Sequence, residues 1–146
     1  MNAQTQHDHV PVRTCMHAGI VSCPPDAPLS EVTRMMSDHR VHAIAVADIG
    51  HGRPWGAWRI VSDMNVMAAI AAGDELTARE LAETEAATVC ADEPLHHAAQ
   101  QMTKHNVAHL IVLDAPDGYP VGIISTLDVA SAHGHRRPGT GRYVSD

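Results

Sequence analysis

The sequence predicts an α+β fold made of two tandem repeats, each containing a strand, a helix, two further strands and a closing helix. Three observations lead to this prediction: a self-similarity at a spacing of 66 residues, helical periodicity after a Pro-Leu pair in each half, and short apolar runs that end before Gly-containing turns. The chain has 146 residues, 45% of them hydrophobic, which is enough for one globular domain with a buried core. A multidomain enzyme is therefore not expected.

The internal repeat is clearest where each half begins. Asp26-Ala27-Pro28-Leu29 recurs as Asp92-Glu93-Pro94-Leu95, and the match extends upstream, where residues 12–15 align with residues 78–81. Downstream, Asp63 aligns with Asp128 once one residue is inserted in the first copy, which places Ile60 where the second copy has a hydroxyl. The repeats therefore span residues 10–75 and 76–134, and the polar ends, residues 1–9 and 135–146, are expected to be flexible tails.

The elements follow the same order in both halves. A short extended piece precedes an amphipathic helix, in which Leu29, Val32 and Met36 share one face; a buried strand, a second strand of a hairpin and a closing helix follow. The expected strands and closing helices are 20–23, 43–46, 55–61 and 63–72 in the first half, and 87–90, 110–113, 121–124 and 128–132 in the second. The first helix of each half follows the Pro and includes Leu29 to Met36 or Leu95 to Met102. Because one half is too small to bury its sheet well alone, we expect the halves to pack sheet to sheet with pseudo-twofold symmetry.

Composition excludes several classes of protein. The formal net charge is -7, and the 10 Lys and Arg residues form no long basic run, so nucleic acid is not an expected partner. No run approaches the roughly 20 apolar residues of a membrane span. The opening residues lack the features of a secretion signal and the three cysteines are an odd number at wide spacing, so we expect a cytoplasmic protein without disulfides.

An ordered set of motifs in the second half resembles a known family. After Asp92-x-Pro94-Leu95 come the strand Leu110-Ile111-Val112 and then Gly122-Ile123-Ile124-Ser125-x-x-Asp128. This pattern resembles the CBS (cystathionine-β-synthase) domain, and the two halves together resemble a CBS pair, or Bateman module. The resemblance implies a regulatory homodimer that needs no cofactor and binds AMP, ADP, ATP or S-adenosylmethionine in a cleft between the repeats. The protein that it would regulate is not indicated.

The residues that end this pattern are the best candidates for ligand contacts. A strand that runs into a helix places the hydroxyls of Ser125 and Thr126 beside free backbone N–H groups at a positive helix end, which suits a phosphate. Asp128 can accept two hydrogen bonds from vicinal ribose hydroxyls, and the resemblance assigns these roles to Ser125 and Asp128. The alternative is purely structural, because Ser-x-x-Asp is also a helix capping box that stabilises by about 1 kcal/mol without any ligand.

The resemblance also implies how the cleft is completed. The first strand of the opposite copy would supply the base pocket, which pairs Asp128 with Ile20 and Val21. The same reasoning gives a second site, with Asp63 facing Ala86 and Ala87, although the first copy departs from the family pattern there.

Two histidines stand where family members often place basic residues for phosphate. His42 and His109 lie at the entrance of the central strand in each copy. A neutral imidazole can donate a hydrogen bond to a phosphate, and a phosphate beside it would strengthen binding at lower pH. The alternative is that both are partly exposed histidines without a ligand.

Other function classes have weaker support. The chain has 12 histidines, but its histidine pairs have no nearby cysteine pair, so a histidine-based metal-binding protein is a less favoured alternative. No nucleophile with an oriented base and no Walker-type loop is present, so we do not expect an enzyme. The main alternative to a sensor is a dimerisation or scaffold module of the same fold that binds no ligand.

Overall fold

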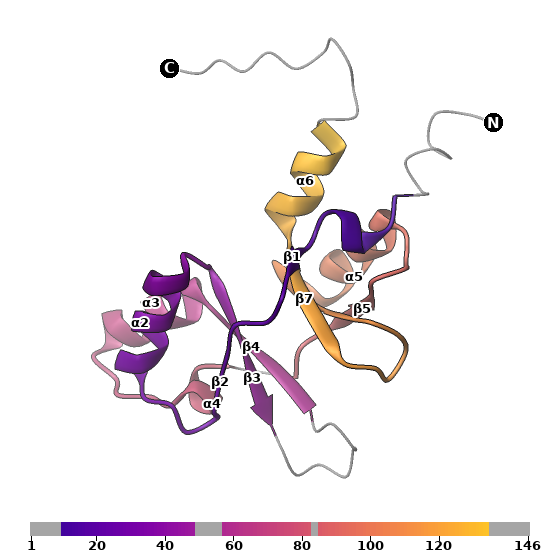
Figure 1. Cartoon of the computed structure of the whole chain (residues 1–146). Coiled ribbons are helices and arrows are strands. Elements are labelled where there is room, and N and C mark those ends of the chain that lie inside the picture. The colour runs from indigo at the N-terminus through magenta and orange to yellow at the C-terminus, as the bar shows by residue number, and fades with distance from the viewer. Residues whose placement is uncertain (1–9, 49–56, 83–84, 135–146) are drawn as a thin grey trace, which may run out of the picture. The chain divides into compact units, whose positions relative to one another are not determined.

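The computed structural model describes residues 10–48, 57–82 and 85–134, which fold into two compact units. One unit consists of Gly19–Ala87, and the other combines residues 10–18 with residues 88–134. Figure 1 labels most of their helices and strands. In both repeats the elements follow the predicted order of strand, helix, strand, strand and helix, so the α+β repeat fold is confirmed. None of the helices in the described ranges is long and apolar enough to cross a membrane.

The unit Gly19–Ala87 has a three-stranded sheet. Its elements are β2 (Ser22–Cys23), α2 (Leu29–His39), β3 (Ala43–Asp48), β4 (Ala57–Ser62), α3 (Asp63–Ala72) and α4 (Ala78–Leu81). Strand β3 lies in the middle, parallel to β2 and antiparallel to β4. Beyond β4, Glu85 forms an antiparallel bridge with Arg59, and the N–H of Ala86 donates to the carbonyl of Trp58 at 2.7 Å.

The other unit has the same core with one more regular strand. Its elements are η1 (Val12–Thr14), β1 (His17–Ala18), β5 (Thr88–Cys90), α5 (Leu95–His105), β6 (His109–Leu113), β7 (Pro120–Ser125) and α6 (Thr126–Gly134). The strand order is β1-β7-β6-β5, with β1 antiparallel to β7 at the edge (Figure 1).

Each sheet is therefore extended by a short segment from the start of the other repeat, here called the leader segment of that repeat. Residues 17–18 pair with β7 of the second repeat, and residues 85–86 pair with β4 of the first. The upstream sequence match between residues 12–15 and 78–81 now has a structural meaning, because η1 and α4 occupy those ranges. The repeat boundaries and the packing of the two sheets on each other both stay predictions from the sequence.

Both leader segments are held by hydrogen bonds and by buried side chains. In the first, Val12 is fully buried, and its N–H donates to the carbonyl of Glu93 at 2.9 Å. In the second, Ala78 is fully buried, and its N–H donates to the carbonyl of Ala27 at 2.8 Å. Thr77 and Glu80 form a capping box at the start of α4, and hydrogen bonds from Thr77 lower the pKa of Glu80.

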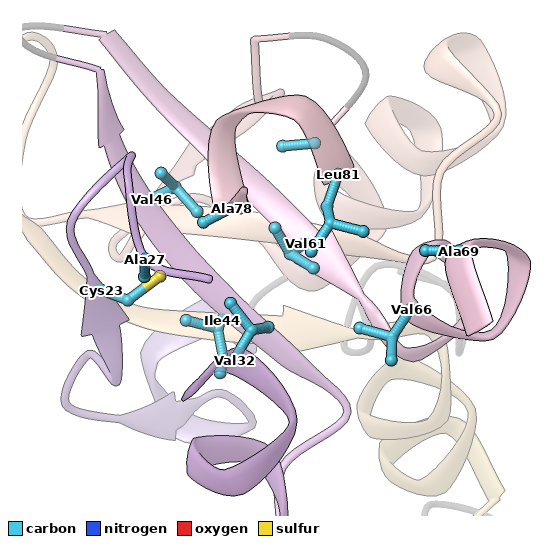
Figure 2. Close-up of a cluster of buried hydrophobic side chains, with 11 residues drawn as sticks. Cys23, Ala27, Val32, Ile44, Val46, Val61, Val66, Ala69, Ala78 and Leu81 are labelled. Atoms are coloured by element: carbon cyan, nitrogen blue, oxygen red, sulfur yellow. The ribbon is translucent and has the colours of Figure 1, made fainter. Parts of the chain in front are cut away.

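The core of the unit Gly19–Ala87 is a cluster of small and branched apolar side chains from its three helices and the sheet. Figure 2 shows Val32 of α2 next to Ile44 of β3, with Val61 of β4 and Leu81 of α4 in the same cluster. Because Val32, Ile44 and Val61 have no exposed surface, each contributes roughly 1.5–3 kcal/mol through burial. The periodicity of the sequence identified this face of α2 correctly.

Most element boundaries lie close to those predicted, and the differences are informative. Helices α2 and α5 start at Leu29 and Leu95, directly after the Pro as expected, and run to His39 and His105. Both end where the next residue, Arg40 or Asn106, takes a left-handed backbone conformation, with φ of 52° and 53°. Strand β1, the turn η1 and helix α4 were not predicted. The expected tails, residues 1–9 and 135–146, and the predicted strand start at Trp55 lie outside the described residues.

Strand β1 reaches β7 at a position where only glycine fits. A Cβ atom on Gly122 would lie 2.5 Å from the carbonyl oxygen of His17 and 2.8 Å from the sulfur of Met16. The first contact is with backbone, which cannot move away without separating the two strands. Gly122 is therefore needed for the close approach of β1.

We expect Gly122→Ala to lower the free energy of unfolding by about 2 kcal/mol, because the added methyl group forces β1 away from β7. Urea unfolding followed by circular dichroism measures this change. The matched control is Gly134→Ala at the end of α6, where a Cβ atom meets nothing within 4 Å and the helix should gain slightly in stability. Equal stability of Gly122→Ala and the wild type would show that β1 is not held against β7.

Burial also predicts the reactivity of one cysteine. Cys23 is 4% exposed, and burial, with a smaller contribution from Glu31, raises the pKa of its thiol from 9.0 to about 11. We expect Cys23 to resist a thiol reagent at pH 8 in the folded protein and to react after unfolding, whereas half-buried Cys15 reacts faster. Mass spectrometry of the labelled peptides identifies the modified residue.

The same shift predicts a loss of stability at high pH. The unfolded chain loses the Cys23 proton first as the pH rises, so this group's contribution to stability falls between about pH 9 and 11. The variant Cys23→Ala should lack this part of the pH dependence. Rapid labelling of Cys23 in the native protein, or an unchanged pH profile in the variant, would contradict the prediction.

Candidate functional site

The candidate site lies where strand β7 runs into helix α6. Ser125 ends the strand, and its side-chain oxygen accepts a hydrogen bond from the N–H of Asp128 at 3.1 Å. In return, Oδ2 of Asp128 accepts from the N–H of Ser125 at 2.9 Å. These reciprocal bonds form a capping box, which satisfies two N–H groups that the start of a helix would otherwise leave unpaired. The structural alternative raised by the sequence is thus realised in the structure.

The second oxygen of Asp128 has a partner that the sequence did not reveal. Nε2 of His17 lies 3.2 Å from Oδ1 of Asp128. The side chain of Asp128 is only 14% exposed, whereas that of His17 is 79% exposed. His17 reaches this place because it pairs with Ile123 across the β1–β7 ladder.

The expectation of free backbone N–H groups at this helix start is only partly correct. The N–H groups of Ser125 and Asp128 are engaged in the capping box, and the N–H of Thr126 donates to the carbonyl of Ala108 at 2.9 Å. A phosphate would therefore find three of these donors already used. The Thr126 side chain remains exposed, and it sits at the positive end of α6.

The carboxylate of Asp128 keeps capacity for a ligand despite its two contacts. An ionised carboxylate offers about four lone-pair sites, and the N–H of Ser125 and His17 use one on each oxygen. One acceptor site on each oxygen remains, which matches the two hydroxyl donors of a vicinal diol. The capping box fixes the orientation of the carboxylate before a ligand arrives.

The first repeat contains the same capping box with a different residue. Ser62 precedes α3, its side chain accepts from the N–H of Asn65 at 3.2 Å, and Oδ1 of Asn65 accepts from the N–H of Ser62 at 2.9 Å. The N–H of Asp63 donates to the carbonyl of His42, as the N–H of Thr126 does to Ala108. The structural counterpart of Asp128 is therefore Asn65.

This correspondence corrects the sequence alignment, which placed Asp63 over Asp128 and Ile60 at the hydroxyl position. Ala43 faces Ser62 in the first repeat, and His109 faces Ser125 in the second, so the chain between these paired residues is three residues longer in the first repeat. The alignment inserted one residue. Asp63 corresponds to Thr126, and the hydroxyl of the first repeat belongs to Ser62.

The histidines predicted as phosphate donors occupy different environments. Nδ1 of His42 lies 3.0 Å from Oδ2 of Asp63, and both side chains are substantially exposed. His109 is half-buried on β6, directly opposite Ser125. A role in phosphate binding stays a prediction for both.

The unit containing α6 brings four of the predicted site residues together: Ser125, Thr126, Asp128 and His109. Ile20 and Val21, which the resemblance placed against Asp128, belong to the unit Gly19–Ala87, and their part in the site stays a prediction. Asp63, His42, Ala86 and Ala87 also belong to that unit, where residues 85–86 flank β4.

A metal centre has no support from the side chains that the structure describes. Within residues 10–48, 57–82 and 85–134, no three His, Cys, Asp or Glu side chains gather as a metal site would require. His7, His9 and His135, which contribute to two of the histidine pairs in the sequence, lie outside these ranges.

Comparison with known proteins agrees with this architecture. The sequence matches the profile of the CBS domain over residues 8–57 and 78–134. No curated protein matches the sequence. A CBS domain protein from Pyrobaculum aerophilum, PAE2072, solved in complex with AMP, is 26% identical, with a TM-score of 0.69 over 82% of this chain and 89% of that one.

Two further solved structures share the fold. The CBS domain pair of protein MJ0100, in complex with 5-methylthioadenosine and S-adenosyl-L-methionine, is 21% identical, with a TM-score of 0.74 over 88% of this chain and 98% of that one. Hypoxic Response Protein I, with two coordinated zinc ions, is 23% identical, with a TM-score of 0.63 over 84% of this chain and 98% of that one.

The two capping boxes should stabilise the protein to a similar extent. We expect Ser125→Ala and Ser62→Ala each to lower the free energy of unfolding by about 1 kcal/mol, because each leaves a helix-start N–H group without its side-chain acceptor. Denaturant unfolding measures both. Ser131→Ala, on the exposed part of α6, is the matched control and should be neutral or slightly stabilising. If the two cap variants behave like this control, the boxes do not stabilise the helices.

Proposed function

Because the chain belongs to the CBS-domain family, we propose that it is a regulatory protein that binds an adenosine-containing ligand and does not transform it. The candidate ligands are AMP, ADP, ATP and S-adenosylmethionine. In this proposal the ribose binds Asp128, and a phosphate or carboxylate of the ligand lies near Ser125 and Thr126. Ligand binding would favour one arrangement of the protein that a regulated partner recognises.

The observation that carries the proposal is the fixed carboxylate of Asp128 at the start of α6. Each oxygen of this carboxylate retains one acceptor site. The capping box that fixes the carboxylate forms without a ligand. The AMP complex of PAE2072, at 26% identity, supports the choice of an adenosine ligand. The adenosine compounds bound to MJ0100 are compatible with the same choice.

The first repeat is the weaker candidate for a second site. Asn65 replaces the carboxylate, and an amide offers one oxygen acceptor where a carboxylate offers two. Asp63 is close in sequence, but it occupies the position of Thr126, and its side chain is 47% exposed, against 14% for Asp128. We therefore propose one principal site per chain, built on Asp128.

A second function is favoured by a separate observation. Helix α3 carries three large apolar side chains that are at least half exposed, Met64, Met67 and Ile70, at helical spacing. Such a face is typical of a contact with another chain, which supports the proposal of a homodimer. A protein that dimerises through this face without binding any ligand is the alternative to the sensor.

A thermal-shift panel with AMP, ADP, ATP, S-adenosylmethionine and NAD tests the sensor proposal. A ligand at 100 times its dissociation constant adds about 2.7 kcal/mol to stability, so we expect at least one adenosine ligand to raise the midpoint by several degrees.

The matched variant for this panel is Asp128→Asn. The first repeat shows that Asn at this position supports the capping box, so the variant should fold normally while losing the charged ribose acceptor. The ligand-induced shift should disappear in Asp128→Asn. If no ligand raises the unfolding midpoint of the wild type, the sensor proposal is rejected and the dimerisation module remains. Sedimentation velocity would then measure whether the protein is a dimer.

A further inference from the structure

The contact between His17 and Asp128 joins an exposed side chain to the partly buried carboxylate of the candidate site. Oδ2 of Asp128 is held by the N–H of Ser125 at 2.9 Å, and Oδ1 lies 3.2 Å from Nε2 of His17. Both carboxylate oxygens are therefore engaged before any ligand arrives. The two contacts differ, because the first is a backbone bond within the capping box and the second is a side chain that is 79% exposed.

The imidazole of His17 is not needed to hold strand β1. Backbone pairing with β7 positions the strand, with His17 opposite Ile123 and Ala18 opposite Gly122. An ion pair with so exposed a partner contributes little to folding stability. The contact therefore affects Asp128 rather than folding. The carboxylate of Asp128 has a hydrogen-bond donor, His17, that can move away without unfolding the protein.

We propose that His17 competes with the ribose for Asp128 and thereby sets the affinity of the nucleoside site, an inference that rests on the function proposed above. A vicinal diol must donate to both oxygens of Asp128, so it has to share Oδ1 with the imidazole or displace it. Displacement costs more when the imidazole is protonated, because a charge-assisted hydrogen bond to a carboxylate is roughly twice as strong as a neutral one.

The sign of the pH dependence follows from the groups around His17. Strand β7, which packs against β1, has no ionisable side chain in Pro120–Ser125, and the charged group placed against His17 is Asp128 of α6. Arg13, in the preceding turn, is paired with Asp92. Lower pH favours the protonated imidazole, which donates the stronger bond, so acid strengthens the contact and weakens ribose binding. This is opposite to the effect expected of a histidine that donates to phosphate.

Adenosine is the probe that isolates the contact, because it carries the ribose but no phosphate and is uncharged near neutral pH. Its dissociation constant is measured by calorimetry at pH 6 and pH 8 for the wild type and for His17→Ala. We expect His17→Ala to bind adenosine roughly fivefold more tightly at pH 6, with a smaller gain at pH 8. His17→Gln, which can still donate a hydrogen bond but cannot gain charge, should bind with little dependence on pH.

The matched control is His105→Ala, which removes an exposed histidine at the end of α5 in the same unit. It should leave the affinity and its pH dependence as in the wild type. Thermal unfolding of each variant verifies that the unit remains folded.

The outcomes separate this inference from the proposed function. If the wild type and His17→Ala bind adenosine equally at pH 6, or the variant binds more weakly, the competition is rejected and the adenosine site stands. If only His17→Ala binds adenosine, competition is supported in its strongest form. If neither protein binds adenosine, AMP or S-adenosylmethionine, both the competition and the proposed function are rejected.

Discussion

The pairing of strand β1 with strand β7 is the contact on which the candidate site depends. It brings the first described residues of the chain to the edge of a sheet that otherwise consists of residues from the second repeat. The pairing is possible because Gly122 has no side chain where the backbone of His17 passes. It is reinforced by fully buried Val12 and by the bond from its N–H to Glu93. The absence of a side chain at Gly122 of β7 thus allows His17 of β1 to reach Asp128.

The strand-to-helix junction shows how one motif serves both folding and binding. Both repeats close the start of their last helix with a serine and a residue three positions later. In the first repeat that residue is Asn65, and in the second it is Asp128. Both give the same backbone bonds, so the fold does not distinguish them, but only the carboxylate adds a negative charge at the helix start, where the helix dipole favours it. The duplication therefore preserves the structure while the two repeats differ in chemistry.

The sequence predicted the elements that have a strong local signal. Helix α2 begins after Pro28 with apolar residues on one face, and strand β6 is a continuous apolar run, so both were identified. Strand β1 has two residues and helix α4 has four, too few for any periodicity to be visible. The capping box Thr77-x-x-Glu80 was a usable signal for α4. The Ser125 and Asp128 pair was recognised because the motif is local.

The rest of the site depends on pairing between distant segments, which composition and spacing do not reveal. His17 lies 111 positions before Asp128, and its neighbourhood offers only an exposed two-residue strand. The strand register in the first repeat could not be predicted from the sequence either. The alignment of the repeats does not show that the chain between β3 and β4 is longer than the chain between β6 and β7. Only the hydrogen-bond ladder, in which Ala43 faces Ser62, shows that Asn65 and not Asp63 takes the place of Asp128.

The exchange of leader segments bears on how such a protein arises by gene duplication. A single ancestral repeat would carry its own leader but leave the outer edge of its hairpin open, and an unpaired edge promotes association with another strand. Two copies of that ancestor would complete each other's sheets by trading leaders, as in domain swapping. Fusion of the two genes then converts an intermolecular contact into an intramolecular one, with a high effective concentration. The strand at residues 17–18 and the segment at residues 85–86 would be what remains of an assembly that once needed two chains.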